Sequence, residues 1–468
     1  MSLDLFNFQL NEAVNFFNSF NNKKTIKIVS HHDADGICSA ALLIKLLNNF
    51  KINYSISIVS VLNSTNINEF AKENYEHYIF SDLGSSYINL INDVFDEKKV
   101  LILDHHIINQ NIKTKKNICH INPYLSKINA SNEISGSGVV YLFCEKLDKS
   151  FISLSYLALI GAIGDCQEKK GFTGINLDLL KKSKKNNLIN HFKGIKIIGS
   201  YSKPIVKFIK QSIDPLIPEL SGDEVKTINF LRKINIEPIK NKKYKTLFDL
   251  NDEEKSKLII ELSKLIPKSK KKNLIGDVYL INSQTGPYKD IREFSTILNS
   301  CGRLNKSTIG IGACLNDNKM KKKALELLNE YKKEILDMIK WFKENKNTKL
   351  IIESNNFIII NCKNFIAPNM IGIFASIISY SNMINKNKFV LTMSRNDDNT
   401  TKISLRYSNK QDNVNLYEII SKITKMVNGE FGGHKNAAGA IINTNLEEQF
   451  ITKAQELFKN LSIQEKIE

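Results

Sequence analysis

Apolar runs and segments of helical periodicity alternate along the first part of the chain. Lys23–Ser30 is a β-rich run, and the Ala, Leu and Ile residues of Ile37–Phe50 recur at the spacing of a helix. Further strand-like runs occur at Ile56–Leu62, Tyr78–Ser81 and Lys99–Leu103. Strands that alternate with helices are typical of a parallel sheet, so the pattern predicts an α/β fold.

The second part of the chain is richer in amphipathic helices. A helix is expected after Asn251, and the run Lys268–Lys272 is expected to be a solvated loop. Asp317–Asn345 carries apolar residues at helical spacing throughout and predicts a helix of roughly 40 Å, long enough to connect two lobes. A second α/β unit should follow, with strands at 350–361, 389–394 and 402–406.

Five polar clusters each follow an apolar run. They are His31–Gly36, Ser81–Asp82, Asp104–His106, Gly164–Asp165 and Gly432–His434. Ligands of parallel sheets collect at the carboxyl ends of the strands, where the first three clusters are expected to lie. The helix predicted at 155–164 can bring the fourth cluster to the same rim.

The residue types in these clusters indicate a metal site. Asp and His supply oxygen and nitrogen ligands for Mn²⁺ or Mg²⁺, and His favours Mn²⁺. The spacing His31-x-Asp33-x-Asp35 places three such side chains on alternate positions, and Gly36 permits a tight turn into the helix. Taken singly, a buried His is more often a core residue, and an Asp before a helix is more often its N-cap. The joint pattern favours two divalent cations, with Mn²⁺ preferred over Mg²⁺, and metal-assisted phosphoester hydrolysis.

Composition is that of an intracellular globular protein. The 468 residues are 42% hydrophobic and 24% charged, which suits two or three packed units. No apolar run reaches the roughly 18 residues of a membrane span. Met1–Phe20 does not resemble a signal peptide, so we expect a cytoplasmic protein with no membrane partner. The seven cysteines form no C-x-x-C pair and are expected to fill the core.

The formal net charge of +18 suits an anionic polymer such as nucleic acid. A bias toward Lys, Asn and Ile, which an AT-rich genome produces, would explain the same charge without any function. Arginine is more informative, because Lys cannot replace it where a planar fork grips a phosphate or a carboxylate. Of the 66 basic residues, five are Arg, at positions 232, 292, 303, 395 and 406.

The motifs carry a family resemblance. SHHDADGICS, SDLG, LDHH, GAIGD and FGGHKNAAGA resemble the successive motifs of the DHH phosphoesterase superfamily with its DHHA1 C-terminal domain, the group that includes the RecJ nucleases. Asn299–Leu304 and Pro368–Ser376 resemble the family's N-A-x-G-R-L and P-x-x-x-G-x-x-A-S segments. Asp214–Leu220 and Arg292–Leu304 look like the archaeal RecJ-like subgroup, which includes the GINS-associated nuclease.

This resemblance implies four segments in the chain. They are a DHH catalytic domain with a parallel sheet (1–200), a mainly helical inserted region (201–290), the N-x-C-G-R segment with the connecting helix (291–346), and a DHHA1 substrate-binding α/β domain (347–468). The short stretch after the GGH cluster leaves no room for the OB-fold of bacterial RecJ proteins. The preference of those proteins for 5′ ends therefore cannot be assumed, and the polarity of digestion stays open.

The resemblance also implies a ligand set for two cations. One cation would be held by His31, Asp33 and Asp82, and the other by Asp35, Asp82, His105 and Asp165, with Asp82 bridging them. His32 also flanks the loop, although the spacing favours His31 as the ligand.

Further roles follow from the same resemblance. Asp104 would orient the histidines, a role typical of a carboxylate beside ligand His, and His106 would contact the scissile phosphate. The second lobe would approach the phosphate of the departing nucleotide through a glycine-flanked histidine. The residues expected to touch nucleic acid are Arg303, Arg395, Arg406, Gly432, Gly433 and His434, and Arg303 is also counted with Asp104 and His106 as catalytic.

Two polar features have alternative interpretations. Arg292 can form a structural ion pair with Glu293 or another acid instead of contacting substrate. Ser135–Gly138, which precedes an apolar helix, can bind a phosphate at the helix N-terminus or serve as a plain helix cap.

The function expected from these inferences is exonucleolytic cleavage of single-stranded DNA or RNA in replication or repair. One alternative is a small-molecule phosphodiesterase or oligoribonuclease of the nanoRNase type, and another is a scaffold of the replicative helicase. The middle region keeps apolar residues such as Ile205, Phe208, Ile209, Leu258, Ile259 and Leu262. Much of that apolar surface must pack inward, but together with the family resemblance it leads us to expect a partner of the GINS type at this region.

Overall fold

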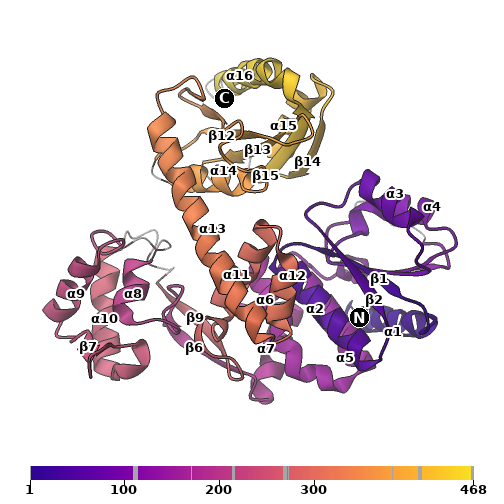
Figure 1. Ribbon diagram of the computed structural model, residues 1–468, viewed down its shortest axis with the longest axis horizontal. Helices are drawn as coiled ribbons and strands as arrows, with labels where there is room; N and C mark the ends of the chain where they lie inside the picture. Colours follow the sequence, from indigo (N-terminus) through magenta and orange to yellow (C-terminus); the bar gives the residue numbers. More distant parts are fainter. Residues whose placement is uncertain are drawn as a thin grey trace. The chain divides into compact units, whose positions relative to one another are not determined.

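Two units make up the chain, Met1–Leu328 and Asn329–Glu468, and each contains its own sheet and helices (Figure 1). The computed structural model describes residues 2–108, 114–169, 171–212, 215, 217–266, 271, 274–381, 383–408 and 414–464, without the side chains of residues 434 and 462–464. Helix α13 (Asn318–Asn345) crosses the boundary between the units. The predicted α/β class is confirmed.

A parallel five-stranded sheet organises the first unit. Its order is β2-β1-β3-β4-β5, and every neighbouring pair is parallel, as the alternating pattern predicted. Because the chain adds β2 on one side of β1 and β3 on the other, the strand order reverses between β1 and β3. Such a reversal opens a crevice at the carboxyl ends of the strands. The strands are β1 (Ile26–His31), β2 (Tyr54–Val59), β3 (His77–Ser81), β4 (Lys99–Leu103) and β5 (Ile118–Ile121).

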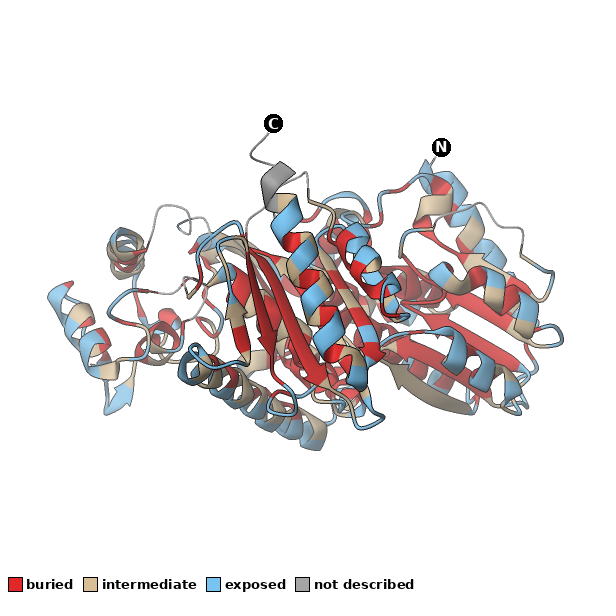
Figure 2. Ribbon diagram, turned by 90° about the horizontal axis from the view of Figure 1, so that it is seen from above, coloured by how far each residue is buried: buried red, intermediate tan, exposed pale blue. Residues whose placement is uncertain are grey.

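Helices cover both faces of this sheet. Successive residues of each strand point to opposite faces, and apolar residues lie on both faces. Ile28 and Ile79 belong to the larger core, whereas Val29 and Phe80 belong to a smaller one. Figure 2 colours buried residues red, and most of the strands are red in it. The smaller core is closed by α3 (Ser64–Lys72) and α4 (Ile88–Val94). The larger core is closed by α1 (Ser2–Asn18), α2 (Ala34–Asn49), α5 (Gly136–Leu147), α6 (Ser155–Gly164), α7 (Gly174–Lys185), α11 (Ile291–Arg303) and α12 (Ser307–Cys314).

The middle of the first unit has a core of its own. Strand β6 (Ile189–Ile195) pairs antiparallel with β9 (Ile275–Ile281). Helix α10 begins after Asn251, as predicted, because Asn251 and Glu254 form a capping box. The other elements between these strands are α8 (Ile205–Lys210), α9 (Glu224–Lys233), β7 (Ile239–Lys240), β8 (Lys243–Tyr244) and α10 (Asp252–Leu265).

The apolar residues that the sequence singled out in this region pack mostly inward. Ile205, Phe208 and Ile209 are buried in the local core together with Leu258 and Leu262. Residues 214 and 216 of the DPLIPEL segment and most of the run 268–272 lie outside the described residues.

A mixed six-stranded sheet organises the second unit, in the order β10-β11-β12-β13-β15-β14. The β11–β12 pair is parallel and the other pairs are antiparallel. The strands are β10 (Ile351–Glu353), β11 (Phe357–Asn361), β12 (Phe389–Arg395), β13 (Thr400–Tyr407), β14 (Glu430–His434) and β15 (Ala437–Asn443), and the helices are α14 (Ile371–Tyr380), α15 (Leu416–Lys425) and α16 (Glu447–Gln464).

One strand prediction in this unit was wrong. The segment 350–361 is a hairpin of two antiparallel strands, β10 and β11, instead of one strand. The backbone N–H of Ser354 donates to the carbonyl of Phe357 at 2.9 Å and closes the turn. The polar residues Ser354, Asn355 and Asn356 supply the turn chemistry that splits the apolar run.

Among the described residues, none of the helices combines the length and the apolar character that a membrane span requires.

Candidate metal centre

Three strands of the first unit end in polar residues at the same edge of the sheet. His31 is the last residue of β1, Asp82 follows β3, and Asp104 follows β4. Because the strand order reverses between β1 and β3, His31 and Asp82 border the crevice that this topology creates. Asp82 also has a φ of 58°, an uncommon conformation for a residue with a side chain, and such backbone conformations cluster at functional sites.

The first turn of α2 presents two more carboxylates. Asp33 caps the helix, and its side chain accepts a hydrogen bond from the Gly36 N–H at 3.0 Å. Asp35 is completely buried, and its two oxygens accept from the N–H groups of Gly136 at 2.6 Å and Ser137 at 2.9 Å. The N-terminus of α5 therefore stabilises the Asp35 carboxylate through hydrogen bonds and its positive dipole end.

This contact decides between the two interpretations of the loop before α5. The Ser135 hydroxyl accepts from the Gly138 N–H and caps the helix, as the simpler interpretation expects. The first free N–H groups of the helix are taken by Asp35, so the phosphate-binding interpretation is not supported.

Glycines make room for the buried acids. A Cβ atom added to Gly161 of α6 would overlap the Asp35 carboxylate and the Ser137 hydroxyl. A Cβ atom on Gly136 would overlap the Asp82 carboxylate in the same way. Helices α5 and α6 can therefore approach the acids closely only because glycine occupies these two positions.

His31, Asp33 and Asp82 form one cluster of potential ligand atoms. Asp33 Oδ2 lies 2.9 Å from His31 Nδ1, and Asp82 Oδ2 lies 3.7 Å from the same nitrogen. The ligand atoms of these three residues all lie within 4.8 Å of one another. Of the two neighbouring histidines, His31 belongs to this cluster, and the metal-ligating clusters found among the described residues do not include His32.

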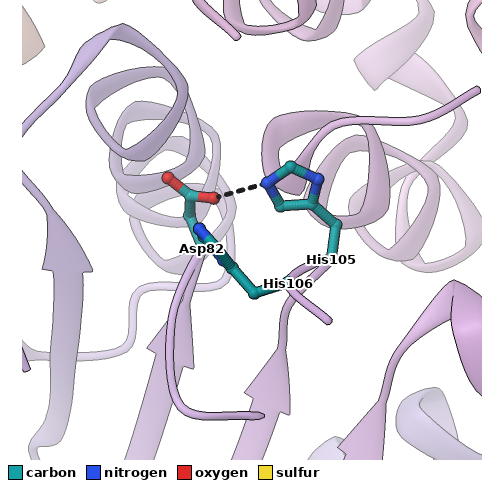
Figure 3. Close-up of side chains that lie close together, drawn as sticks. All are labelled: Asp82, His105 and His106. Carbon is teal, nitrogen blue, oxygen red and sulfur yellow. Dashed lines mark ion pairs between the residues drawn. The ribbon is translucent and has the colours of Figure 1, made fainter. Parts of the chain in front are cut away.

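Asp35, His105 and Asp165 form a second cluster. His105 Nε2 lies 3.2 Å from Asp165 Oδ2 and 3.7 Å from Asp35 Oδ2. The same nitrogen lies 3.3 Å from Asp82 Oδ1, the contact drawn in Figure 3. The two oxygens of Asp82 thus face different clusters, Oδ2 the one at His31 and Oδ1 the one at His105.

The donor set fits divalent cations. Asp82 Oδ1 and His105 Nε2 are buried and have no hydrogen-bond partner among the described residues. Burial raises the pKa of Asp35, and the charges of Asp82 and Asp165 raise it further. Bound cations would satisfy these atoms and remove the repulsion between the carboxylates.

Asp104 holds the Asp-His-His turn together without joining either cluster. Its Oδ1 accepts from the His105 N–H at 2.7 Å and from His106 Nδ1 at 2.7 Å, and its Oδ2 accepts from the Ser85 N–H at 2.8 Å. Burial lowers the pKa of His106, but the neighbouring Asp104 carboxylate outweighs it and raises that pKa to about 9. His106 is 40% exposed, and it also lies within ligand range of Asp82 and His105.

Ser85 and Asn122 support this turn, and the sequence analysis assigned neither of them. Ser85 Oγ lies 2.8 Å from His120 Nε2, and Asn122 Nδ2 donates to Ser85 Oγ and to the carbonyl of His106, at 2.9 Å each. Asn122 follows β5 just as Asp104 follows β4, and this repeated strand-end position was the available signal.

The Asn299–Leu304 segment lies directly against the acidic loop. Asn299 Oδ1 accepts from the Ala34 N–H, which lies between Asp33 and Asp35, at 2.9 Å. A Cβ atom on Gly302 would overlap the carbonyl oxygen of His32. Asn299 and Gly302 thus share the face of α11 that contacts the loop, a role that the sequence analysis did not assign. Arg303 ends α11 and is half-buried.

Three of the five arginines form ion pairs within the protein, Arg232 with Glu237 and the two considered next. Arg292 binds Glu168, with Nη2 2.9 Å from Oε1, so its acid is Glu168 and not Glu293. Arg395 grips Glu447 with two hydrogen bonds, from Nε at 2.9 Å and from Nη2 at 3.0 Å. The fork that was expected to hold a phosphate therefore holds a carboxylate, and substrate contact by Arg395 is not supported.

The remaining substrate candidates lie in the second unit. Arg406 on β13 donates to Ser376 Oγ at 3.1 Å and Ser404 Oγ at 3.0 Å. Gly432 and Gly433 are exposed on β14, and Gly433 has a φ of 128° that favours glycine. His434 is the last residue of β14, and its side chain lies outside the described residues.

Comparison with known proteins identifies the domains. Residues 25–162 match the DHH family N-terminal domain, 197–275 the DHH-CID domain and 354–460 the DHHA1 domain. An uncharacterised protein of Methanocaldococcus jannaschii is 31% identical over 438 residues, which cover 92% of this chain and 93% of the relative.

Solved structures share the fold at low sequence identity. RecJ from Thermus thermophilus in complex with Mn²⁺ is 15% identical with a TM-score of 0.59, and the match covers 97% of this chain but 55% of that RecJ chain. Cdc45 from Entamoeba histolytica is 13% identical with a TM-score of 0.64 and coverage of 97% and 98%. The domain matches show that the chain belongs to the DHH phosphoesterase superfamily, and its fold resembles those of RecJ and Cdc45.

Proposed function

We propose that the protein is a metal-dependent exonuclease that hydrolyses phosphodiester bonds in single-stranded DNA or RNA. The observation that carries the proposal is the position of Asp82, whose two oxygens face two separate clusters of ligand atoms. His31, Asp33 and Asp82 would hold one divalent cation, and Asp35, Asp82, His105 and Asp165 the other. Two cations in such a site supply an activated water and stabilise the charge that develops on the phosphate.

Mn²⁺ is the preferred cation in this proposal, with Mg²⁺ as a second choice. The mixture of imidazole and carboxylate ligands supports this order, because imidazole suits transition metals better than Mg²⁺. Crystals of Thermus thermophilus RecJ have been solved in complex with each of these ions, which supports divalent metals for the same fold.

The chain's own residues would orient the scissile phosphate. The Asp104 carboxylate accepts from His106 Nδ1, which leaves Nε2 of this partly exposed ring available for a phosphate oxygen. A charge-assisted hydrogen bond from that ring would be stronger than a neutral one. Arg303 and Arg406 would contact the nucleic-acid backbone, and Gly432, Gly433 and His434 would bind the departing nucleotide.

A scaffold function is the second candidate. The fold match to Cdc45 extends over nearly all of both chains. In this proposal an active nuclease also binds a replication protein of the GINS type through the region 201–290, although the apolar residues of that region pack mostly inward.

An assay with end-labelled strands tests the proposed activity. We expect stepwise shortening of single-stranded DNA or RNA with Mn²⁺, slower shortening with Mg²⁺, and full, reversible loss with a chelator. Dinucleotides should be poorer substrates than long strands. Rapid cleavage of dinucleotides with no action on long strands would favour the oligoribonuclease alternative. If neither substrate were hydrolysed, the scaffold function would be the one supported.

A further inference from the structure

A cavity of about 400 Å³ lies within the second unit, and none of its lining residues belongs to the candidate metal centre or to the proposed substrate contacts. Helix α13 forms one wall with Glu334, Asp337, Met338 and Trp341, whose spacing places them on one face of the helix. Phe365 and Met370, from the segment between β11 and α14, line the opposite wall. We call this cavity the α13 cleft.

The interior of the cleft is apolar and its lip is aromatic. Met338 and Met370 are buried, and the Trp341 ring packs between Phe365 and Phe374, with centroids 5.9 Å and 6.4 Å apart. Phe365 is nevertheless 70% exposed. A large apolar side chain left that exposed beside an open apolar cavity is typical of a binding surface.

The rim of the cleft is acidic in a strongly basic chain. Glu334 and Asp337 line the mouth, and Glu330 lies one turn earlier on the same side of α13. Burial raises the pKa of Glu334, and the charges of Glu330 and Asp337 add to the effect. In the described part of the chain none of the three carboxylates forms an ion pair, although the sequence holds 66 basic residues.

These features select one class of occupant. Carboxylates at the mouth repel phosphates, so nucleic acid does not suit the cleft. They attract ammonium and guanidinium groups, which the faces of Trp341 and Phe365 also favour. A volume near the lower end of the roughly 300–1,000 Å³ of ligand pockets accommodates one or two side chains.

We propose that the α13 cleft is a docking site for a partner protein. The partner would present a peptide segment in which an apolar or aromatic side chain enters the cleft and an adjacent Lys or Arg pairs with Glu334 and Asp337. The contact is small, so we expect a transient interaction of modest affinity. This interface is separate from the middle region and does not depend on the nuclease activity.

Binding in the cleft can be followed by the fluorescence emission of Trp341, because this residue lines the cleft and is the single tryptophan of the chain. A displayed library of random peptides is panned against the full-length protein and depleted on a Glu334→Gln/Asp337→Asn variant. We expect the enriched peptides to combine an apolar or aromatic residue with Lys or Arg. Synthesised, they should shift the emission of Trp341, bind the variant about tenfold or more weakly, and lose affinity for a Phe365→Ala variant.

A matched control variant distinguishes the effect of the cleft carboxylates from the effect of the net charge of the helix. The Glu326→Gln/Glu344→Gln variant removes two exposed carboxylates from the same helix outside the cleft, and it should bind the peptides as the wild type does. Unchanged thermal melting and nuclease rates would show that both double variants are folded.

Four results would overturn the proposal. Panning could enrich no peptide that distinguishes the wild type from the cleft variant, or the two double variants could lose affinity equally. A single-stranded oligonucleotide could shift Trp341 emission and displace the peptide, which would assign the cleft to nucleic acid. Acrylamide could fail to quench Trp341 in the free protein, which would show that the chain itself covers the cleft.

Discussion

The buried carboxylate of Asp35 serves two purposes at the scale of single residues. It accepts two hydrogen bonds from the N-terminus of α5, and it faces the His105 cluster with its remaining lone pairs. A structural role and a ligand role are therefore combined in one side chain, and suitable substitutions can separate them.

Asp35→Asn and Asp35→Ala make that separation. Asn keeps one acceptor for α5, but it loses the charge and turns its NH₂ group toward the second backbone N–H. We therefore expect Asp35→Asn to bind Mn²⁺ weakly, to retain at most a few per cent of the activity, and to lose less stability than Asp35→Ala. Ala leaves two buried N–H groups unsatisfied and should also lose stability, by about 1–3 kcal/mol for each group. Calorimetric Mn²⁺ titration and thermal melting test this, and near-normal Mn²⁺ binding by Asp35→Asn would refute the ligand role.

Asn299 is expected to act as a positioning residue. Its side chain holds the Ala34 N–H between Asp33 and Asp35, so removal should loosen the ligands without removing one. Losses of this indirect kind typically weaken metal affinity by about 10–100-fold. For Asn299→Ala we predict a higher half-saturating Mn²⁺ concentration, with most of the activity restored at high Mn²⁺.

Thr296→Ala is the control for this change. The Thr296 hydroxyl donates within α11, to the carbonyl of Arg292, and does not bond to the acidic loop. Equal Mn²⁺ dependence of the two variants would show that the contact between Asn299 and Ala34 does not position the metal ligands.

Sequence patterns reveal these residues to different degrees. The acidic and histidine side chains at the sheet edge could be named in advance because they occur in short contiguous motifs after apolar runs. The contact of Asn299 with Ala34 bridges 265 positions, and no local pattern announces it. The pairing of Arg395 with Glu447 likewise joins residues 52 positions apart, so an arginine that looked available for phosphate was already bound.

At the scale of elements, Arg395 connects strand β12 to helix α16. Arg395 ends β12, and Glu447 begins α16 and also accepts from Thr401 and Asn361. Arg395→Lys cannot reproduce the two parallel hydrogen bonds. We predict a loss of about 1–3 kcal/mol in the stability of the second unit, seen in its thermal melting, with unchanged affinity for single-stranded DNA. A loss of affinity for single-stranded DNA without a loss of stability would show instead that Arg395 contacts the substrate.

A buried histidine joins α1 to the sheet and introduces a pH dependence. His77 Nε2 accepts from the Asn21 N–H at 2.8 Å, and its ring stacks on Phe20 at 4.5 Å. Burial lowers the pKa of His77 in the folded protein. In the unfolded chain, this histidine takes up a proton near pH 6.5, whereas in the folded protein it does so only at a lower pH. Protons therefore bind preferentially to the unfolded chain, and His77 destabilises the fold as the pH falls below about 6.5.

His77→Gln keeps an acceptor for Asn21 but does not titrate. We predict that the melting temperature of the wild type falls more steeply between pH 7.5 and 5.5 than that of the variant. The metal ligands titrate in both proteins and cancel in the comparison. Parallel curves would show that His77 does not contribute to the pH dependence.

The elements themselves were predictable where periodicity and flanking residues agreed. Helix α6 has the predicted bounds, and α13 differs from its prediction by one residue. The hairpin of β10 and β11 was missed because its polar turn is short and apolar residues flank it on both sides. Helix α1 went unassigned because Asn and Phe are common in it and are weak helix formers.

At the scale of the whole molecule, the chemistry is divided between two units. The clusters of potential metal ligands found in the described part of the chain all belong to Met1–Leu328, whereas Arg406 and the Gly432–His434 cluster belong to Asn329–Glu468. The net charge of +18 has two explanations, attraction of nucleic acid and a genomic bias toward Lys. The salt dependence of strand binding distinguishes them, because each phosphate neutralised adds about 0.7 to the slope of log K against log salt concentration.

Arg406→Lys tests whether the rare arginines carry function beyond charge. The Arg406 guanidinium is held by Ser376 and Ser404, so its fork is fixed in direction, and a Lys would keep the charge without that geometry. We predict a several-fold loss of affinity for single-stranded DNA with an unchanged salt slope, since the number of charges stays the same. The exposed pair Lys322→Gln/Lys323→Gln on α13 serves as the control and should change affinity little. If the two variants behave alike, the arginines are no more informative than the lysines, and the genomic bias explains the charge.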